Sequence, residues 1–402
     1  MRRWGYTPLL IISLVFLVVA TWYNYQFKPL GQGDKVVTSS IDEVNREADS
    51  GPASAQTELD RAFSGLPDKQ KVGLTLAFPL LVDDNLTVSS SAQEISVWSV
   101  MAQTQPGFIS LFGQGISQEQ MAIVKAQLDR IFAGQPWQPV LAVDHEGGLV
   151  QRLSGDGFAS LESWYEVCHL PGEERSAIMS DTALQLIKVG IGVVYGPVVD
   201  LYQSGSSLGH RSCSADPAVV TTRALELMQA YLGQGVLPVI KHYPGLGQSS
   251  RDLHQSFEVV AGNEADLQPF LSILSQQPLS GVMVSHAGVK DLYLTPCSLT
   301  KKCVNALLEE FPKTLVFSDA LDMQAVYANP ELEIEKGDLL TASRLALEAG
   351  VDVLVFGQGV KPEQMHQLSL DLVELYQHDP NFKSLIDAHA RKIWDYRQIY
   401  WQ

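Results

Sequence analysis

Eight short apolar segments, rich in β-branched residues, alternate along the chain with longer segments of helical periodicity. The apolar segments span residues 72–78, 107–112, 139–144, 189–200, 236–242, 281–286, 314–319 and 351–357. Regular alternation of strand and helix is typical of βα units and a parallel sheet. Eight such units in a chain of this length match a (β/α)8 barrel. We therefore predict an α/β fold with one (β/α)8 TIM barrel, and we keep a doubly wound open sheet as the alternative.

The overall composition is that of a globular protein with one large core. The chain has 402 residues, of which 46% are hydrophobic and 18% are charged, and its net charge is −17. A strongly acidic protein repels nucleic acid and anionic lipid. We therefore expect no nucleic-acid partner, and a neutral or small polar substrate fits better. The sequence carries no signal for an oligomeric state.

The N-terminal segment differs from the rest of the chain. Residues 1–27 combine Arg2 and Arg3 with an apolar run from Leu9 to Ala20 and aromatic residues on both flanks. This pattern predicts a transmembrane anchor with its N-terminus in the cytoplasm. We expect a polar tether over residues 28–66 and a catalytic domain over residues 67–402, held outside the inner membrane in the periplasm. The alternative is a signal peptide that is cleaved on export.

The four cysteines show no metal-binding spacing. They are Cys168, Cys213, Cys297 and Cys303. Because no CxxC pair is present, a zinc cluster is not expected. Export would permit disulfides, but we expect buried free thiols.

Polar residues end several of the predicted strands. They are Asp144, Asp200, Lys241, His242, His286 and Asp319. In a (β/α)8 barrel the carboxyl ends of all strands surround one mouth, so these side chains are expected to form a pocket there. The alternative is that each residue caps the turn or helix that follows it.

Two groups in this set suit chemistry at an acetal carbon. Asp319 is a carboxylate at a strand end, suited to be a nucleophile or base, although it could instead cap a helix. Asp252 and His254 lie two apart in a loop rich in Gly and Ser, where the carboxylate can support a protonated imidazole. Together they fit a double displacement. A metal site of His242, Asp252 and His254 remains an alternative without a recognised spacing, and we expect no metal or cofactor.

Five segments then show a resemblance to a known family. The loop KHYPGLGQSSRDLH, residues 241–254, resembles the KH(F/I)PGxGxxxxDxH signature of family 3 glycoside hydrolases of the β-N-acetylglucosaminidase type. VDHEGGLVQRL resembles the family's DQEGGxVQR segment, YGPVVDL its APVxD strand, GHRSCSADP its GxRSFGxDP loop, and VFSDALDM its SDxLxM segment. These segments occur in family order and cover the chain from Val72 onward.

The resemblance implies a role for each matching residue. Asp319 would be the nucleophile, His254 the acid/base and Asp252 its partner, while the sugar-binding residues would be Asp144, Arg152, Arg211, Lys241 and His242. It implies a retaining exo-β-N-acetylglucosaminidase that acts on peptidoglycan-derived or related glycans. The chain departs from the family pattern at Leu246, Leu149, His145 and Cys213. These departures remove no implied catalytic group, but they leave the fit to the aglycone open.

Three alternatives remain at this point. The first is an inactive barrel that binds sugar at the cell wall. The second is an enzyme of altered specificity, such as a β-glucosidase, although that subgroup usually takes its acid/base from an additional domain. The third is transfer of the glycosyl group to phosphate instead of water.

Overall fold

The computed structural model describes residues 53–83 and 97–401. Residues Glu58–Gln402 form one compact unit. The predicted anchor, residues 1–27, and most of the predicted tether lie outside the described residues. Within those residues, no helix combines the length and apolar character that a membrane span requires.

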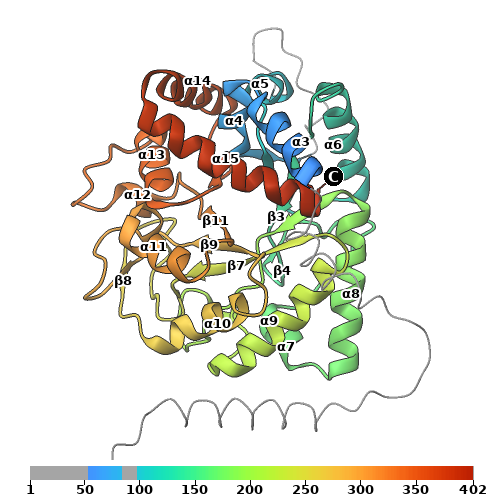
Figure 1. Ribbon diagram of the computed structural model, residues 1–402. Helices are drawn as coiled ribbons and strands as arrows, with labels where there is room; N and C mark the ends of the chain where they lie inside the picture. The colour runs from blue at the N-terminus through green and yellow to red at the C-terminus, as the bar shows by residue number, and fades with distance from the viewer. Residues whose placement is uncertain (1–52, 84–96, 402) are drawn as a thin grey trace, which may run out of the picture. The chain divides into compact units, whose positions relative to one another are not determined.

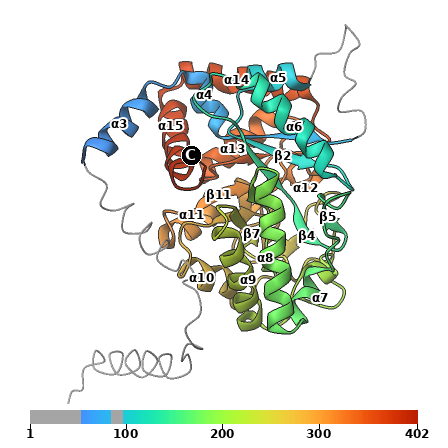
Figure 2. The same cartoon turned by 90° about the vertical axis from the view of Figure 1, so that its right-hand side faces the viewer.

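Eight parallel strands form the centre of the compact unit (Figures 1 and 2). They are β1 (Leu76–Leu81), β2 (Phe108–Phe112), β3 (Val140–Val143), β6 (Ile191–Val194), β7 (Leu237–Tyr243), β9 (Gly281–Val284), β11 (Leu315–Ser318) and β12 (Leu354–Val355). The sheet order is β11-β9-β7-β6-β3-β2-β1-β12, so each strand pairs with the next one along the chain. A parallel bridge between Phe317 and Val353 joins the two ends of the sheet. The α/β barrel is therefore nearly closed, and the open-sheet alternative is wrong.

The first and the fourth predicted strands differ most from the strands in the structure. The first begins at Leu76 and not at Val72, because Asp68–Leu74 forms helix α4. A short apolar run does not distinguish a strand from a buried helix by periodicity. The fourth ends at Val194, just before Gly196 and Pro197 interrupt the pairing, and a bridge from Val198 to Lys241 resumes it. Proline has no N–H to donate to a ladder, which accounts for the interruption.

Helices cover the outside of the barrel in both views (Figures 1 and 2). They include α5 (Val97–Thr104), α6 (Gln118–Ile131), α8 (Gly172–Lys188), α9 (Pro217–Leu232), α10 (Glu264–Leu274), α11 (Lys301–Glu310), α13 (Leu339–Ala349), α14 (Pro362–His378) and α15 (Pro380–Tyr400). The remaining elements are α3 (Ala53–Ser64), α4, α7 (Trp164–His169), α12 (Gln324–Tyr327), the 3-10 turns η1 (Gly209–Arg211) and η2 (Cys297–Leu299), and the short strands β4 (His145–Gly147), β5 (Val150–Gln151), β8 (Val259–Val260) and β10 (Gly288–Val289).

The C-terminal helix closes the amino end of the barrel. The ring of Trp401, directly after α15, packs edge-on against Phe108 of β2 with centroids 5.5 Å apart. Its Nε1 donates a hydrogen bond to the carbonyl of Gly192 at 3.1 Å. Phe108 also packs edge-on against Phe317 inside the barrel. Aromatic side chains therefore pack against one another at this end of the barrel interior.

All four cysteines are paired, which corrects the expectation of free thiols. Cys168 in α7 bonds to Cys213, and Cys297 in η2 bonds to Cys303 in α11, with Cα separations of 5.7 and 5.4 Å. The first pair is separated by 45 residues in sequence. Only the fold brings such distant residues within the range that a disulfide requires.

Candidate active site

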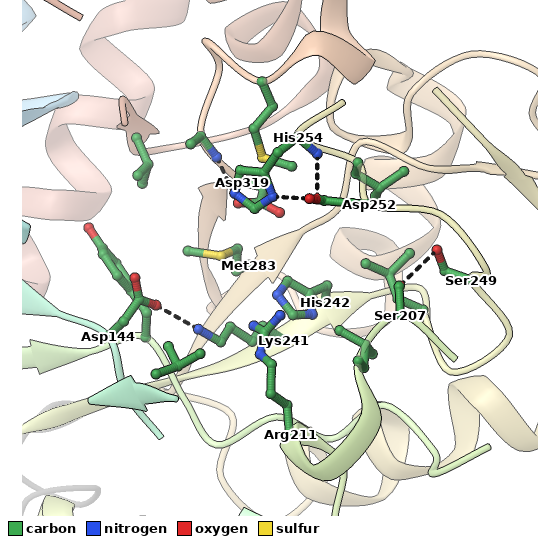
Figure 3. Close-up of a pocket in the computed structure, with 18 of the residues that line it drawn as sticks. Asp144, Ser207, Arg211, Lys241, His242, Ser249, Asp252, His254, Met283 and Asp319 are labelled. Atoms are coloured by element: carbon green, nitrogen blue, oxygen red, sulfur yellow. Dashed lines mark hydrogen bonds and ion pairs between the residues drawn. The ribbon is translucent and has the colours of Figure 1, made fainter. Parts of the chain in front are cut away.

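A polar pocket opens at the carboxyl end of the barrel, with a volume of about 290 Å³ (Figure 3). All eight residues to which the family resemblance gives a role line it, namely Asp144, Arg152, Arg211, Lys241, His242, Asp252, His254 and Asp319. They come from the ends of β3, β7 and β11 and from the loops beside them. Of the six strand-end residues predicted to form this pocket, four line it, whereas Asp200 and His286 are fully buried and do not, so the prediction is wrong for these two. The roles of the individual side chains remain predictions.

Asp319 follows β11 and is held by the backbone around it. Its N–H donates to the carbonyl of Val284 at 3.0 Å, and its Oδ1 accepts a hydrogen bond from the Ala320 N–H at 2.8 Å. The next helix, α12, begins only at Gln324, so the alternative that Asp319 caps a helix is wrong. Burial alone would raise the pKa of Asp319, but the His242 imidazole and the Ala320 N–H outweigh it and hold the pKa below its ordinary value. The carboxylate is therefore ionised and fixed.

A network of buried charges forms the wall of the pocket beneath β3 and β7. Its centre is Glu146, whose side chain is only 1% exposed. Glu146 accepts hydrogen bonds from Arg211 at 2.8 and 3.0 Å and lies 2.6 Å from the Lys241 Nζ. Lys241 also donates to Asp144 at 2.7 Å, and Arg152 lies 3.9 Å from the other oxygen of Asp144. These contacts hold the side chains in place before any ligand arrives.

The charges in this network shift the pKa values of its members. Burial alone would raise the pKa of Glu146, but the charges of Arg211 and Lys241 outweigh burial and place it well below its ordinary value. Burial alone would lower the pKa of Lys241, but Asp144 and Glu146 outweigh it and raise the pKa. Both groups therefore keep their charges across the physiological pH range.

Glu146 was missed as a site residue by the reasoning from sequence. It belongs to the short strand β4, which pairs with β5 in a hairpin. The turn requires Gly147, whose φ is +93° and where an added Cβ would overlap the carbonyl of Glu162. The sequence does contain a pattern that could have identified it, because Glu146 lies two residues after Asp144 and directly before the two glycines.

A β-bulge directs two consecutive residues of β7 into the pocket. Side chains of a regular strand alternate between faces, so Lys241 and His242 would normally point in opposite directions. The pairing of β7 with β9 shifts register between Lys241 and Tyr243, which inserts His242 as an extra residue. Both side chains consequently line the same cavity.

Asp200 was predicted to lie at the pocket mouth, but it lies buried behind the pocket and orients His242. It is fully buried, and its Oδ2 accepts from the His242 ring Nδ1 at 2.7 Å and from the His242 N–H at 3.1 Å. Its Oδ1 accepts from the Leu246 N–H at 2.6 Å. Since Nδ1 is bound to Asp200, the Nε2 of His242 is left for a ligand. Asp200 ends its apolar segment in the sequence, but nothing there indicates its partner.

Asp252 and His254 lie at the mouth, on the Asp319 side of the pocket (Figure 3). The His254 Nδ1 lies 2.7 Å from Asp252 Oδ1, which also accepts from the His254 N–H at 2.9 Å. The side chain of His254 is 71% exposed and that of Asp252 is 48% exposed. Hydrogen bonding to His254 lowers the pKa of Asp252 against the opposing effect of partial burial. This pair is therefore in contact with solvent and able to exchange protons.

The loop that carries this pair is docked on the barrel. Leu253 is 5% exposed and packs in a small apolar cluster with Met323 and Ala325. The carbonyls of Leu253 and His254 accept from the N–H groups of Ala325 and Gln324 at 3.2 and 3.4 Å. Glu258 accepts from Ser249, Ser250 and Arg251 and so ties the stem of the loop.

The departures from the family pattern have different surroundings. Leu246 is buried and lines the pocket, whereas Leu149 is 94% exposed. His145 is buried, its Nδ1 has no hydrogen-bond partner, and burial lowers its pKa to about 4. Cys213 is bonded to Cys168.

The residues proposed for a metal site have other partners. His242 contacts Asp200, and His254 contacts Asp252. Across residues 53–83 and 97–401, no group of three or more His, Cys, Asp or Glu side chains is arranged to hold a metal ion. This geometry does not favour the metal-site alternative.

The arrangement points to one class of enzyme. A fixed carboxylate faces a pocket of sugar size, a carboxylate–imidazole pair lies at the mouth, and charged hydrogen-bonding groups line the opposite wall. A nucleophile and a separate proton donor at the carboxyl end of a (β/α)8 barrel are the elements of a glycoside hydrolase.

Comparison with known proteins defines the family. Residues 84–393 match the family described as "Glycosyl hydrolase family 3 N terminal domain", and the chain belongs to this family. It is 29% identical over 308 residues to a β-hexosaminidase of Bordetella avium, covering 72% of this chain and 83% of the relative. It is 34% identical over 202 residues to β-hexosaminidase LpqI of Mycobacterium tuberculosis, covering 48% of this chain and 51% of the relative.

A solved structure agrees with the fold. The β-N-acetylhexosaminidase from Beutenbergia cavernae aligns with a TM-score of 0.68 at 24% identity, over 82% of this chain and 97% of the other. The chain is thus a family 3 glycoside hydrolase of the β-hexosaminidase type, as its sequence motifs indicated.

Proposed function

We propose that the protein is a retaining exo-β-N-acetylglucosaminidase that works through a covalent glycosyl intermediate on Asp319. The observation that carries the proposal is the position of two different groups at one pocket. Asp319 is held ionised on the rigid end of β11, and His254 lies at the solvent-exposed mouth with its Nδ1 bound to Asp252. Relatives named β-hexosaminidase supply the sugar class.

In the first step, Asp319 attacks the anomeric carbon and the bond to the leaving oxygen breaks. Because Oδ1 is occupied by the Ala320 N–H, Oδ2 is the attacking oxygen. The protonated His254 donates from Nε2 to the leaving oxygen, while Asp252 accepts from Nδ1–H and stabilises the imidazolium. The products are the free aglycone and a glycosyl ester of Asp319.

In the second step, the same imidazole acts as a base. Neutral His254 takes a proton from water at Nε2, the water oxygen attacks the anomeric carbon, and the ester bond to Asp319 breaks. Two inversions at one carbon retain the β configuration. The proton taken from water replaces the one that His254 gave to the leaving oxygen, so the imidazole is back in its starting state, and its exposed position lets water reach Nε2.

The wall opposite the catalytic pair suits a sugar. Hydroxyl and amide oxygens are bound by charged donors, and the planar fork of an arginine fits two acceptors. Arg211, Lys241 and Asp144 are already held by Glu146 and by one another, so little side-chain entropy is lost on binding. A pocket closed at the far end by the barrel interior favours removal of a terminal sugar over cleavage inside a glycan.

We place the enzyme outside the cytoplasm and propose peptidoglycan-derived glycans as its substrate. Two disulfides support this location, because disulfides persist in oxidising compartments and are rare in the cytosol. The apolar segment over residues 1–27 supplies the anchor in this proposal, with cleavage of that segment as the alternative.

The test is hydrolysis of 4-nitrophenyl β-N-acetylglucosaminide by the purified full chain. Asp319→Asn keeps the shape of the side chain but removes the nucleophile, so kcat should fall on the order of a thousandfold or more. Asp322→Asn is the matched control, because Asp322 bonds to the Gly357 N–H and lies outside the pocket lining. No release by the folded parent, with retained binding of N-acetylglucosamine, would instead establish the inactive sugar-binding barrel.

A further inference from the structure

One segment of the chain, Ser285–Cys303, lies between the two halves of the proposed catalytic machinery. It leaves β9 at the pocket and ends in α11. On one side it contacts the residue after Asp319, and on the other side it pairs with the strand that follows the Asp252–His254 loop. We call this segment the bracket.

The first side of the bracket is a chain of buried hydrogen bonds that ends at the nucleophile. His286 is fully buried, and its Nε2 lies 2.9 Å from the Ala320 carbonyl. Its Nδ1 lies 2.6 Å from the hydroxyl of Ser298, which is also fully buried. Ala320 in turn donates its N–H to Asp319 Oδ1.

The partners determine the protonation state of this histidine. A carbonyl only accepts, so Nε2 carries a proton and donates it to Ala320. Burial lowers the pKa of His286 and favours the neutral ring, so Nδ1 carries no proton and accepts from the Ser298 hydroxyl. One tautomer in one orientation thus satisfies all three groups.

The second side of the bracket reaches the acid/base loop. Strand β10 pairs in parallel with β8, with Gly288 opposite Val259 and Val289 opposite Val260. Val260 and Val289 belong to the apolar cluster that buries Leu253, the residue between Asp252 and His254. The bracket therefore contacts the supports of both catalytic groups.

A disulfide closes the far end of the bracket. Cys297, directly before Ser298, is bonded to Cys303. The N–H of Cys297 donates to the Ala287 carbonyl and the N–H of Ser298 donates to the Ser285 carbonyl, both at 3.0 Å. The disulfide and these two bonds hold the Ser298 hydroxyl against His286.

We propose that Ser298 and His286 are positioning residues that align Asp319 with His254, and that the Cys297–Cys303 disulfide maintains this alignment. The inference rests on the proposed function of Asp319 and His254. It adds a specific consequence, which is that the turnover rate depends on a disulfide that contacts no substrate.

The first test is Ser298→Ala, which leaves the buried His286 Nδ1 without a donor. We expect kcat on the chromogenic substrate to fall on the order of tenfold, with KM nearly unchanged, because misalignment affects the reacting atoms more than sugar binding. Ser298→Thr restores a hydroxyl and should recover most of kcat. A folded Ser298→Ala variant with the kcat of the parent would overturn the proposal.

The second test removes the disulfide and leaves Ser298 unchanged. Because both cysteines are fully buried, the disulfide is removed by substitution, and the Cys297→Ser/Cys303→Ser variant should show a lower kcat with KM nearly unchanged. The Cys168→Ser/Cys213→Ser variant is the matched control and should not show this loss of kcat. A folded Cys297→Ser/Cys303→Ser variant with the kcat of the parent, or the same loss in the control variant, would refute the proposed role of the bracket.

A third readout separates this inference from the proposed function. The N–H of Asp319 bonds to Val284 and that of Leu321 to Val355, so amide hydrogen exchange of residues 319–321 reports the order of the nucleophile segment. Exchange there should rise in Ser298→Ala and in the Cys297→Ser/Cys303→Ser variant. This holds even if the parent hydrolyses nothing, whereas unchanged exchange in both variants would reject the bracket alone.

Discussion

The two sides of the pocket differ sharply in how their charges are held. On the β3 and β7 wall, the side chains of Glu146 and Lys241 are 1% and 2% exposed and bonded to each other. At the mouth, those of Asp252 and His254 are 48% and 71% exposed. The wall is supported by opposite charges, and the mouth by a docked loop.

This difference corresponds to two kinds of chemistry. A buried ion pair is rigid and costly to break, because a lone charge that remains loses its hydration without compensation. Such a wall suits the binding of a sugar in one orientation. An exposed carboxylate–imidazole pair keeps most of its hydration, so a change in its charge costs little free energy. This suits an acid/base that gives up a proton and takes one back in each cycle.

The largest effect is expected from removing the imidazole at the mouth of the pocket. His254→Ala should lower kcat on an unactivated β-N-acetylglucosaminide on the order of 10²- to 10⁴-fold, because general acid–base catalysis contributes about that much. With 4-nitrophenol as leaving group the first step needs little protonation, so the glycosyl ester should accumulate. Mass spectrometry of the intact protein during turnover measures this ester. Equal losses on both substrates, without accumulation, would contradict the acid/base role.

The second prediction breaks the wall. Glu146→Gln leaves Arg211 and Lys241 without their shared counterion and should lower the free energy of unfolding by about 3 kcal/mol at pH 7. Urea unfolding measures it. The matched control is Glu166→Gln, which breaks the exposed pair with His210 and should change stability by less than about 1 kcal/mol.

The pH dependence of this effect has a defined sign. The pKa of Glu146 is lower in the folded protein than in the unfolded chain, so its stabilisation is fully present above the unfolded value and is lost as pH falls toward the folded one. The difference between parent and Glu146→Gln should therefore shrink below about pH 4. A constant difference from pH 7 to pH 3 would mean that the charge of Glu146 does not stabilise the wall.

The third prediction concerns His145, beside the wall but outside the ion pairs. Its pKa is lowered to about 4 by burial, so the neutral form stabilises the fold above the unfolded value near 6.5. That stability is lost as pH falls toward the folded value. Between pH 7 and pH 4 the parent should lose on the order of 2 to 3 kcal/mol more than His145→Gln. Parallel stability curves for the two proteins would contradict a buried neutral His145.

The smallest effect is expected from a substitution that weakens the support of the mouth loop without removing a catalytic group. Glu258→Gln weakens the hydrogen bonds to Ser249, Ser250 and Arg251 that tie the loop stem. We expect a loss in kcat of about threefold to fivefold, equivalent to about 1 kcal/mol or less. Steady-state kinetics checks it, with Glu264→Gln in the first turn of α10 as an exposed control. A loss as large as that of His254→Ala would mean that Glu258 takes part in the chemistry itself.

Much of the fold was readable from local patterns. Each of the eight apolar segments overlaps a strand of the barrel, and four of the six polar residues at their ends line the pocket, because successive parallel strands lie side by side. The predicted start of the first strand, Val72, was less accurate. Val72 lies in helix α4, since an apolar run fits a buried helix as well as a strand.

The sequence by itself determined the class of fold, the family and the residues that meet at the pocket, because spacing and residue type are local properties. Only the tertiary structure decided their partners. Glu146 lies 95 residues before Lys241 and Asp200 lies 42 before His242, yet each pair is in contact. The four cysteines, expected to be free, are paired, and Ser298 contacts His286 beneath the nucleophile segment. Such contacts depend on how the strands and loops pack around one mouth, and a buried charge or thiol obtains its chemistry from the neighbour that this packing supplies.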